Sequence, residues 1–366
     1  MFVGLREIRA AKGRFTLMGA VVAMITLLLV MLTGLTNGLA SQNTAALEGI
    51  DPDRFVLGTT AGDTPPEDLT FPESSVTGAD LQAWRDTPGV TEVQPVGMTQ
   101  TLLTGDSSSS VAVLGVPTGS GLVERTAGAA ESGRTEPADG GVVVSESIAA
   151  DQDLTIGELV KVGNSDLEVQ GIVADQYYSH SEVVWVNSSS WREIAHAEDD
   201  VVGTALAVFG TDVAWDDTAA QTSTLALPLA DAFAALPAYS SEQGSLVMMQ
   251  GFLYAISALV IVSFVTVWTI QRTRDLAVLR ALGGSPGYLL RDSLGQAAVI
   301  LAIGVTVGAV LGGVLGALSA TAVPFTSSLL LVVGPSAGIW VLGVLGSALA
   351  VRRVTRVDPV LALGGN

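Results

Sequence analysis

Residues that could perform catalysis or hold a metal are sparse in this sequence. Its 366 residues include two histidines and no cysteine, and the carboxylates are scattered, not grouped at metal-ligand spacing. The G-x-S-x-G motif and a Ser-His-Asp arrangement are missing. Lys12 and Lys161 lack the glycine-rich approach of a P-loop. We therefore expect a chain that is not an enzyme by itself, holds no metal or cofactor and binds no ATP.

Four long apolar blocks without charged side chains dominate the rest of the sequence. The blocks are residues 16–41, 246–270, 294–318 and 327–350. Each can cross the ~30 Å of membrane hydrocarbon as a helix. With 49% hydrophobic and 14% charged residues, the chain is predicted to be a membrane protein with four spans. Ionisable residues would mark an ion relay inside the spans, so their absence argues against an ion-driven transporter.

Charge divides the chain between the two sides of the membrane. Residues 42–245 hold 32 of the 36 carboxylates but 6 of the 17 basic residues, a net charge of −26. The other basic residues flank the apolar blocks: Arg6, Arg9, Lys12, Arg14, Arg272, Arg274, Arg280, Arg291, Arg352, Arg353 and Arg356. By the positive-inside rule, both termini are cytoplasmic and residues 42–245 are extracytoplasmic. We expect membrane lipid as a partner and no nucleic acid.

The first block has an alternative interpretation as a cleaved signal peptide, because residues 38–40 (GLA) loosely resemble a cleavage site. Its length favours a retained span instead, since signal cores have roughly 7–15 apolar residues. Residues 1–15 before it form an amphipathic pattern that predicts an interfacial helix; a basic flank that only fixes topology is the alternative. Residues 351–366 are expected to form a cytoplasmic tail.

The segment outside the membrane is predicted to be an α+β domain. Short β-type runs occur at residues 90–96, 111–116, 141–145, 159–162, 167–173 and 183–186. Helical patterns lie near 79–86, 145–151 and 228–236. Polar stretches at 59–80 and 117–140 indicate a loop and a mobile insertion or hinge. Without cysteine, this domain must be stabilised by its own core.

Residues 271–293 are predicted to form the cytoplasmic connection between spans two and three. A basic helix ends at Gly283-Gly284, and Ser285-Pro286 begins the next helix. Span three then carries glycines at four-residue spacing: Gly304, Gly308, Gly312 and Gly316. Such a stripe lets helices approach closely, so we expect spans three and four to pack tightly within the subunit, with a dimer seam as the alternative.

The sequence resembles the FtsX/MacB-like permeases of ABC transporters. The resemblance is carried by residues 272–294 (RTRDLAVLRALGGSPGYLLRDSL), the glycine-rich third span, residues 351–363 (VRRVTRVDPVLAL) and residues 145–175. It implies a 1+3 arrangement of four transmembrane helices, with an α+β extracytoplasmic domain between helices 1 and 2, as in type VII ABC exporters. It also implies a homodimer bound to two copies of a separate ATPase, which would hold the ATP and Mg.

The same resemblance implies that the cytoplasmic connection docks into the ATPase as a coupling helix. Leucines on one side would be buried there while charged side chains orient the contact. The residues concerned are Arg272, Arg274, Asp275, Leu276, Leu279, Arg280 and Leu282. A solvated basic loop that only fixes topology is the alternative.

The first 58 residues more narrowly resemble the haem-efflux permeases of Gram-positive bacteria, the HrtB group, which implies haem as the transported substrate. The composition suits an actinobacterial host and a location in the cell membrane. Haem needs apolar or aromatic contacts, an axial ligand for iron and a cation for its propionates. The candidates lie near the outer ends of spans one and two or in the outer domain: Met31, Glu48, Asp51, Arg54, Phe55, Tyr177, Tyr178, His180, Tyr239, Met248, Met249 and Tyr254.

Two other functions remain open at this stage. The chain could be an FtsX-like transmitter whose outer domain regulates an extracellular cell-wall hydrolase, or a peptide or antibiotic exporter of the same family. Each candidate haem ligand also has a structural alternative, because methionines in spans commonly pack and interfacial tyrosines commonly anchor the helix.

Overall fold

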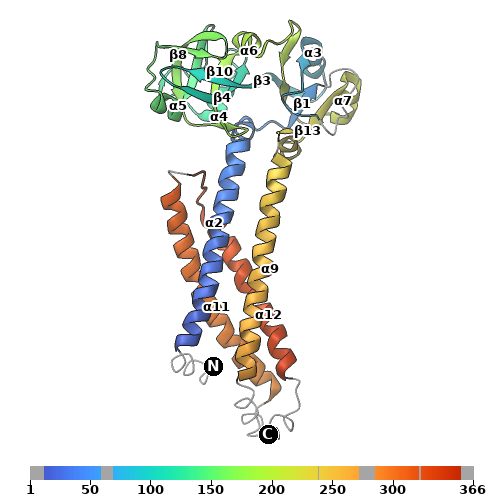
Figure 1. Ribbon diagram of the computed structural model, residues 1–366. Helices are drawn as coiled ribbons and strands as arrows, with labels where there is room; N and C mark the ends of the chain where they lie inside the picture. Colours follow the sequence, from blue (N-terminus) through green and yellow to red (C-terminus); the bar gives the residue numbers. More distant parts are fainter. Residues whose placement is uncertain (1–11, 59–68, 238, 272–284, 321–322, 356–366) are drawn as a thin grey trace. The chain divides into compact units, whose positions relative to one another are not determined.

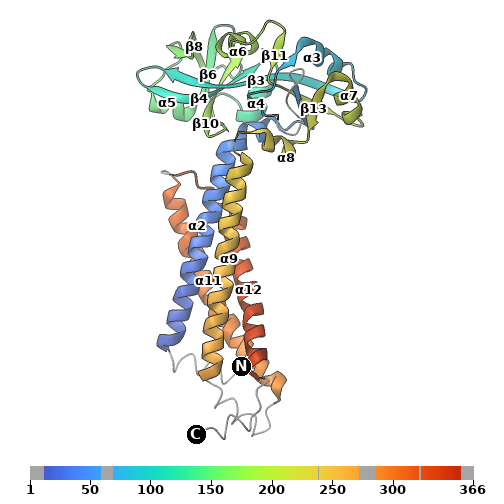
Figure 2. The same ribbon diagram turned by 45° about the vertical axis from the view of Figure 1, so that its right-hand side comes forward.

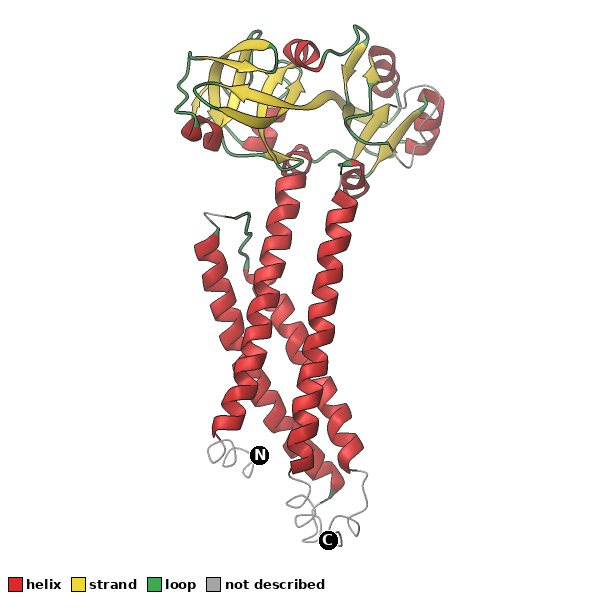
Figure 3. Cartoon of the chain, viewed as in Figure 1, coloured by secondary structure: helices red, strands yellow, loops and turns green. Residues whose placement is uncertain are grey.

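The computed structural model describes residues 12–58, 69–237, 239–271, 285–320 and 323–355. The chain divides into two units, which are described separately. The membrane unit comprises the chain up to Gly38 and from Gln243 onward, and the outer unit comprises Leu39–Glu242. Helices make up the first unit, whereas the second is mostly strands with short helices (Figure 3).

Among the described residues, four helices are long and apolar enough to cross a membrane. They are α2 (Lys12–Ile50), α9 (Tyr239–Gln271), α11 (Pro286–Ser319) and α12 (Leu329–Thr355). The fold therefore has one span before the α+β domain and three after it. The expected interfacial helix at 1–15 lies mostly outside the described residues, and α2 continues to Ile50 beyond the expected span end at 41.

The glycines of α11 lie against α2. A Cβ atom built at Gly304 would be 3.1 Å from Val22 Cβ, and one at Gly308 would be 2.7 Å from Thr26 Cβ. At Gly312 the neighbour is Val30, and at Gly316 it is the Phe325 ring in the loop before α12. Since lipid removes the hydrophobic driving force between helices, this close backbone approach is what joins them.

The glycines of α12 serve the same purpose toward α9. A Cβ at Gly346 would be 2.7 Å from Val262 Cγ2, and one at Gly338 would be 3.1 Å from Tyr254 Cε1. Spans three and four also lie side by side. Spans three and four therefore pack together within the subunit, as expected, and the glycine stripe on span three faces span one.

The outer unit contains a closed β-barrel. Its strands, in the order of their pairing, are β3 (Val90–Thr104), β4 (Ser108–Val116), β10 (Ser181–Asn187), β6 (Gly141–Ser145), β8 (Ser165–Val173) and β7 (Leu159–Val162). Closure comes from β7, which pairs with β3 as well as β8. Alternating valines and leucines fill the interior, including Leu103, Val113, Val144 and Leu167.

Beyond the barrel, β3 continues into a second group of strands (Figure 1). This group is ordered β13 (Thr224–Leu227), β1 (Arg54–Gly58), β12 (Ala205–Gly210) and the first half of β3. Helices α3 (Gly78–Arg85) and α7 (Trp215–Thr222) lie beside it (Figure 2), where Trp84 and Trp215 stack with centroids 5.9 Å apart.

Short elements complete the outer unit. They are β2 (Val76–Thr77), α4 (Leu122–Ala127), β5 (Ser132–Gly133), α5 (Glu146–Asp151), β9 (Tyr177–Tyr178), α6 (Ser188–Ala195), β11 (Val201–Gly203), α8 (Leu229–Ala232) and a 3-10 turn at Phe233–Ala235. The stretch 117–140, expected to be a mobile insertion, contains α4, and its Leu122 and Val123 are fully buried. These two apolar residues anchor part of the segment to the core.

The last turns of α2 belong to the outer unit. Ala46, Leu47 and Ile50 are fully buried in a core cluster with Phe55 and Leu57 of β1. Asp51 ends the helix with a positive φ of 46°, and its N–H donates to the Leu47 carbonyl at 3.2 Å. The last turns of α2 are therefore held in the core of the outer unit by buried side chains.

Candidate functional site

Within the outer unit, polar side chains gather where α2 ends and α9 begins. We call this group the junction site: Asn43 and Glu48 of α2, His180 of the β9–β10 turn, and Tyr239 and Glu242 of α9. These residues come from segments far apart in the sequence. The structure brings five side chains together. The sequence marked Glu48, His180 and Tyr239 separately, and it did not mark Asn43 and Glu242.

The β9–β10 turn positions His180. Tyr178 pairs with Ser181, which leaves Ser179 and His180 as a two-residue turn. Both have positive φ, 48° and 63°, as a type I′ hairpin requires. Their N–H groups donate to carbonyls of α2, Ser179 to Asn43 at 3.1 Å and His180 to Gln42 at 2.9 Å. The turn is thus docked directly on α2.

The side chains of the turn and the two helices converge on one carboxylate oxygen. Glu242 Oε2 lies 2.9 Å from His180 Nε2 and accepts from Asn43 Nδ2 at 3.4 Å. The two nitrogens are 3.2 Å apart. When His180 Nε2 carries a proton, both nitrogens donate to the same oxygen. Asn43 is 1% exposed, so its side chain forms the buried part of this group.

Glu48 and Tyr239 lie at the same junction. Glu48 is exposed and accepts a hydrogen bond from Thr44 Oγ1 at 2.6 Å. Tyr239 is partly buried, packs against Phe233 and lies within electrostatic range of Glu48. A carboxylate, an imidazole and a phenol, all of them possible ligands of haem iron, therefore lie at one end of the outer unit.

Two predicted residues are part of the core instead. Phe55 is 0% exposed and meets Phe71 edge to face at 5.7 Å, and Tyr178 is 2% exposed and meets the same ring at 6.3 Å. Burial raises the pKa of the Tyr178 hydroxyl above its ordinary value. Because both side chains are enclosed, their contacts stabilise the fold, and neither is placed to reach a ligand at the surface.

Tyr177, on the opposite face of the same strand, lies among carboxylates. Burial, with Asp175 and Glu182 adding repulsion, raises the pKa of its hydroxyl. Burial also raises the pKa of Glu182, with further contributions from Asp175 and Asp151. Like charges held together in this way disfavour an anionic ligand, so this surface does not suit a propionate.

Arg54, the candidate cation, stacks over the Trp215 ring at 5.7 Å. That contact orients the guanidinium, and Arg54 is partly buried in β1. Asp51 ends helix α2, where its N–H donates to the Leu47 carbonyl. Met31 is partly buried in α2, and Tyr254 contacts the Gly338 face of α12.

In the membrane unit, large apolar side chains remain exposed near the start of α9. Met248, Met249 and Phe252 are 61%, 49% and 62% exposed. Phe252 follows Met248 by four residues and Met249 by three, so the three share one helical face. This face can contact lipid or an apolar ring.

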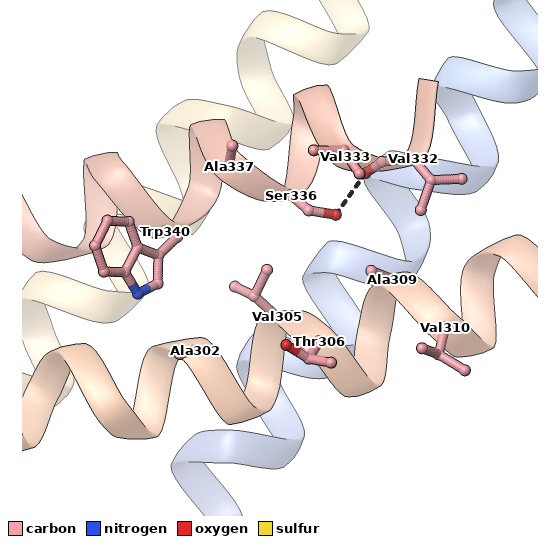
Figure 4. Close-up of a pocket in the computed structure, with 10 residues that line it drawn as sticks. All are labelled: Ala302, Val305, Thr306, Ala309, Val310, Val332, Val333, Ser336, Ala337 and Trp340. Atoms are coloured by element: carbon pink, nitrogen blue, oxygen red, sulfur yellow. Dashed lines mark hydrogen bonds between the residues drawn. The ribbon is translucent and has the colours of Figure 1, made fainter. Parts of the chain in front are cut away.

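A groove of about 480 Å³ runs between α11 and α12 (Figure 4). Trp340 lies at one end, and its indole N–H donates to the Ala298 carbonyl at 3.1 Å. The hydroxyls in the lining belong to Thr306 and Ser336, and Ser336 donates to the Val332 carbonyl at 2.6 Å. This lining suits an apolar group and offers no side chain that ligates iron.

The predicted coupling residues Arg272, Arg274, Asp275, Leu276, Leu279, Arg280 and Leu282 lie outside the described residues.

The two junction-site residues that were not predicted have a weak signal in the sequence. Asn43 and Glu242 are polar side chains at the edge of long apolar runs, in the last turns of one helix and the first turn of another. The sequence could not predict that His180, 137 residues after Asn43, would lie next to them in the fold.

Comparison with known proteins places the chain in a family. Residues 15–225 match the MacB-like periplasmic core domain, and residues 247–359 match the FtsX-like permease C-terminal domain. The chain is 23% identical over 364 residues to a Staphylococcus epidermidis protein named as a hemin transport system permease, HrtB, covering 98% of both chains. It is 25% identical to an uncharacterised ABC transporter permease of Mycobacterium bovis, covering 100% of this chain and 99% of that one.

Among solved structures, the periplasmic region of MacB from Actinobacillus actinomycetemcomitans is 15% identical. It matches 50% of this chain and 92% of that one, with a TM-score of 0.37. The two domain matches together extend over both the outer unit and the membrane helices. The chain therefore belongs to the FtsX/MacB-like family of ABC transporter permeases.

Proposed function

We propose that this permease exports haem from the membrane to the outside, powered by a separate ATPase. The observation that carries the proposal is the similarity to a hemin transport permease along 98% of both chains, membrane helices and outer unit alike. Haem is amphipathic, so it can enter from the membrane plane. That route avoids the outer segment, whose net charge of −26 would repel an anionic porphyrin.

Different parts of the chain supply the contacts that haem requires. Met31, Met248 and Met249 offer thioethers, and Phe252 offers an aromatic face. In the outer unit, Glu48, His180, Tyr239 and Glu242 offer axial ligands. Asp51, Arg54 and Tyr177 stay in the proposal as secondary contacts, with Arg54 as the cation for a propionate.

The assembly we propose is a homodimer of this chain with two cytoplasmic ATPase subunits that hold ATP and Mg. Both termini and residues 271–293 face the cytoplasm, and Arg272, Leu276, Leu279 and their neighbours dock into the ATPase. The basic residues beside the apolar blocks support this topology. The cell membrane of a Gram-positive actinobacterium is the proposed location.

A transmitter that regulates a cell-wall hydrolase is the second candidate. The observation that favours it is the burial of Ala46, Leu47 and Ile50 of α2 in the core of the outer unit, since a helix fixed in this way passes its motion to the domain. A peptide or antibiotic exporter of the same family would have the same helix attachment.

Haem titration of the purified permease separates these candidates. We expect a shift of the Soret band on binding, and weaker binding by about tenfold in variants that lose an axial ligand, such as Glu48→Gln, Tyr239→Phe or Met248→Leu. Glu193→Gln, an exposed carboxylate on α6, and Met24→Leu, an exposed methionine elsewhere on α2, are matched controls. No Soret shift in the wild-type protein would contradict haem as the substrate.

A further inference from the structure

A second apolar pocket of the membrane unit lies between the first turns of α2 and the last turns of α9. Its volume is about 210 Å³. The outer unit lies between α2 and α9 in the chain, so these are the helix ends opposite to those that join it. Gln271, the last residue of α9, adds an amide to a lining that is otherwise aromatic and aliphatic: Phe15, Leu17, Met18, Phe264, Val267 and Trp268.

Two aromatic rings and a methionine form the floor of this pocket. Phe15 and Trp268 meet edge to face with ring centroids 6.0 Å apart. Met18 and Trp268 are 7% and 9% exposed and belong to a core cluster that includes residues of all four spans. At the rim, Leu17 and Val267 are 60% and 54% exposed. The pocket is therefore a hollow with a buried floor, open to the hydrocarbon that surrounds a membrane helix.

Basic residues lie beside this pocket on α2. Arg14 directly precedes Phe15 and lies three and four residues before Leu17 and Met18, so it occupies the same helical face one turn nearer the helix end. Lys12 belongs to the same first turn of α2. An apolar hollow with positive charge at one end matches a lipid tail that carries an anionic headgroup.

The larger groove between α11 and α12 lacks this combination. Its lining comes from the middle of both helices, between Ala302 and Val310 on α11 and between Val332 and Trp340 on α12. The charged residues of α11 and α12 lie at the helix ends, more than two helical turns from this lining. The groove therefore suits an apolar chain without selecting its headgroup.

We propose that the pocket between α2 and α9 binds part of one acyl chain of an anionic phospholipid, whose headgroup is held by the positive charge at the start of α2. The lining of α9 from Phe264 to Gln271 extends for ~10 Å at 1.5 Å per residue, so the pocket takes part of a tail. A lipid bound there bridges α2 and α9. The site is separate from the proposed haem contacts and does not depend on haem as the cargo.

Two tryptophans allow the pocket and the groove to be observed separately. Trp268 lines the pocket, Trp340 lines the groove, and the other four tryptophans of the chain belong to the outer unit. The full-length permease is reconstituted in dioleoylphosphatidylcholine vesicles with a rising fraction of a lipid brominated on its acyl chains, either phosphatidylglycerol or phosphatidylcholine. Bromine quenches tryptophan fluorescence at short range. The variant Trp340→Phe reports on Trp268, and Trp268→Phe reports on Trp340 as the matched control.

We expect half-maximal quenching of Trp268 at about a fivefold lower fraction of brominated phosphatidylglycerol than of brominated phosphatidylcholine, the preference that one basic residue near the membrane surface supplies. Trp340 should respond equally to the two lipids. Both leaflets contain the brominated lipid, so the orientation of the permease does not affect the result. Equal responses of Trp268 to the two headgroups would overturn the site, and so would the same preference at Trp340.

A charge variant tests the headgroup contact. Arg14→Gln should remove the preference of Trp268 for phosphatidylglycerol and leave quenching by phosphatidylcholine unchanged, because the apolar lining is intact. Arg291→Gln, at an exposed basic residue near the start of α11, is the matched control and should keep the preference. A full preference in Arg14→Gln would contradict the proposed headgroup contact. If haem stimulates ATP hydrolysis while Trp268 shows no preference, haem export stands and the lipid site falls.

Discussion

At the residue scale, the glycines of the third span show which features of helix packing the sequence predicts and which it does not. Their four-residue spacing correctly predicted close helix packing, because a face without side chains allows any neighbouring helix to approach closely. It could not predict which partner, since both span one and span four present small residues. Only the fold reveals that Gly304 and Gly308 lie against α2.

Adding one methyl group at Gly308 tests this contact. A Cβ there would be 2.7 Å from Thr26 Cβ, so we expect Gly308→Ala to destabilise the permease by about 1–3 kcal/mol through overpacking. Gly251→Ala on α9 is the control, because no atom lies within 4 Å of its Cβ position. Thermal unfolding in nanodiscs measures both. Equal melting temperatures for the two variants would exclude the close α2–α11 approach.

The raised pKa of Glu182 leads to a pH-dependent prediction. Because the folded protein holds this proton more tightly than the unfolded chain does, Glu182 costs stability as pH rises from the ordinary glutamate pKa of about 4.3 through the raised value. Glu182→Gln should therefore unfold at a higher temperature than wild type at neutral pH. The difference should vanish below that ordinary pKa. A constant difference across pH contradicts this environment for Glu182.

At the scale of elements, the predicted strands and helices of the outer domain were largely confirmed. The run 90–96 is the first half of β3, and 167–173 lies in β8. Strand β1 and helix α7 were missed, because β1 directly follows a long helix and α7 has no fully buried residue to give it an apolar stripe. The β9–β10 turn was missed as well, since Ser179 and His180 take positive φ without a glycine to signal it.

Closure of the barrel was also beyond sequence patterns. Alternation predicts that β7 has one buried face, and Val160 and Val162 are indeed buried. It does not predict that the strand pairs on both edges, to β3 and to β8. Such pairings join residues far apart in the chain, and period-2 patterns say nothing about partners.

The predicted coupling helix gives a test at this scale. Leu279→Asp should abolish assembly with the ATPase, because it places a charge on the apolar side formed by Leu276, Leu279 and Leu282. Ala281→Asp, on the opposite side of a helix with 3.6 residues per turn, should leave assembly intact. Co-purification of the tagged ATPase measures both. Intact assembly and transport in Leu279→Asp would refute the coupling role.

At the scale of the whole molecule, the topology follows from charge and apolar length together. A chain without cysteine allows single reporter cysteines to be read directly. Ser107→Cys in the β3–β4 connection should react with an impermeant maleimide in intact cells, whereas Ser285→Cys should react only after the cells are opened. Both positions are exposed, so access within the fold does not limit labelling. Labelling of both from outside would contradict cytoplasmic placement of the connection at 271–293.

The proposal that haem is the substrate must be tested on the complex of this permease with its ATPase. The chain supplies membrane helices and an outer unit, and the family supplies the expectation of a partner ATPase, so transport requires the complex. Sequence similarity supports the proposal of haem, and the junction site and the exposed methionines are proposed as separate contacts for it.

The decisive measurement for haem export is ATP hydrolysis by the permease–ATPase complex in nanodiscs, titrated with haem. Haem should raise the rate several-fold and saturably, and a hydrophobic peptide at equal concentration should not. Glu48→Gln and Met248→Leu should require more haem for the same stimulation, while Met24→Leu should match wild type. A rate that stays flat across the haem titration, in a complex that hydrolyses ATP, would contradict haem export.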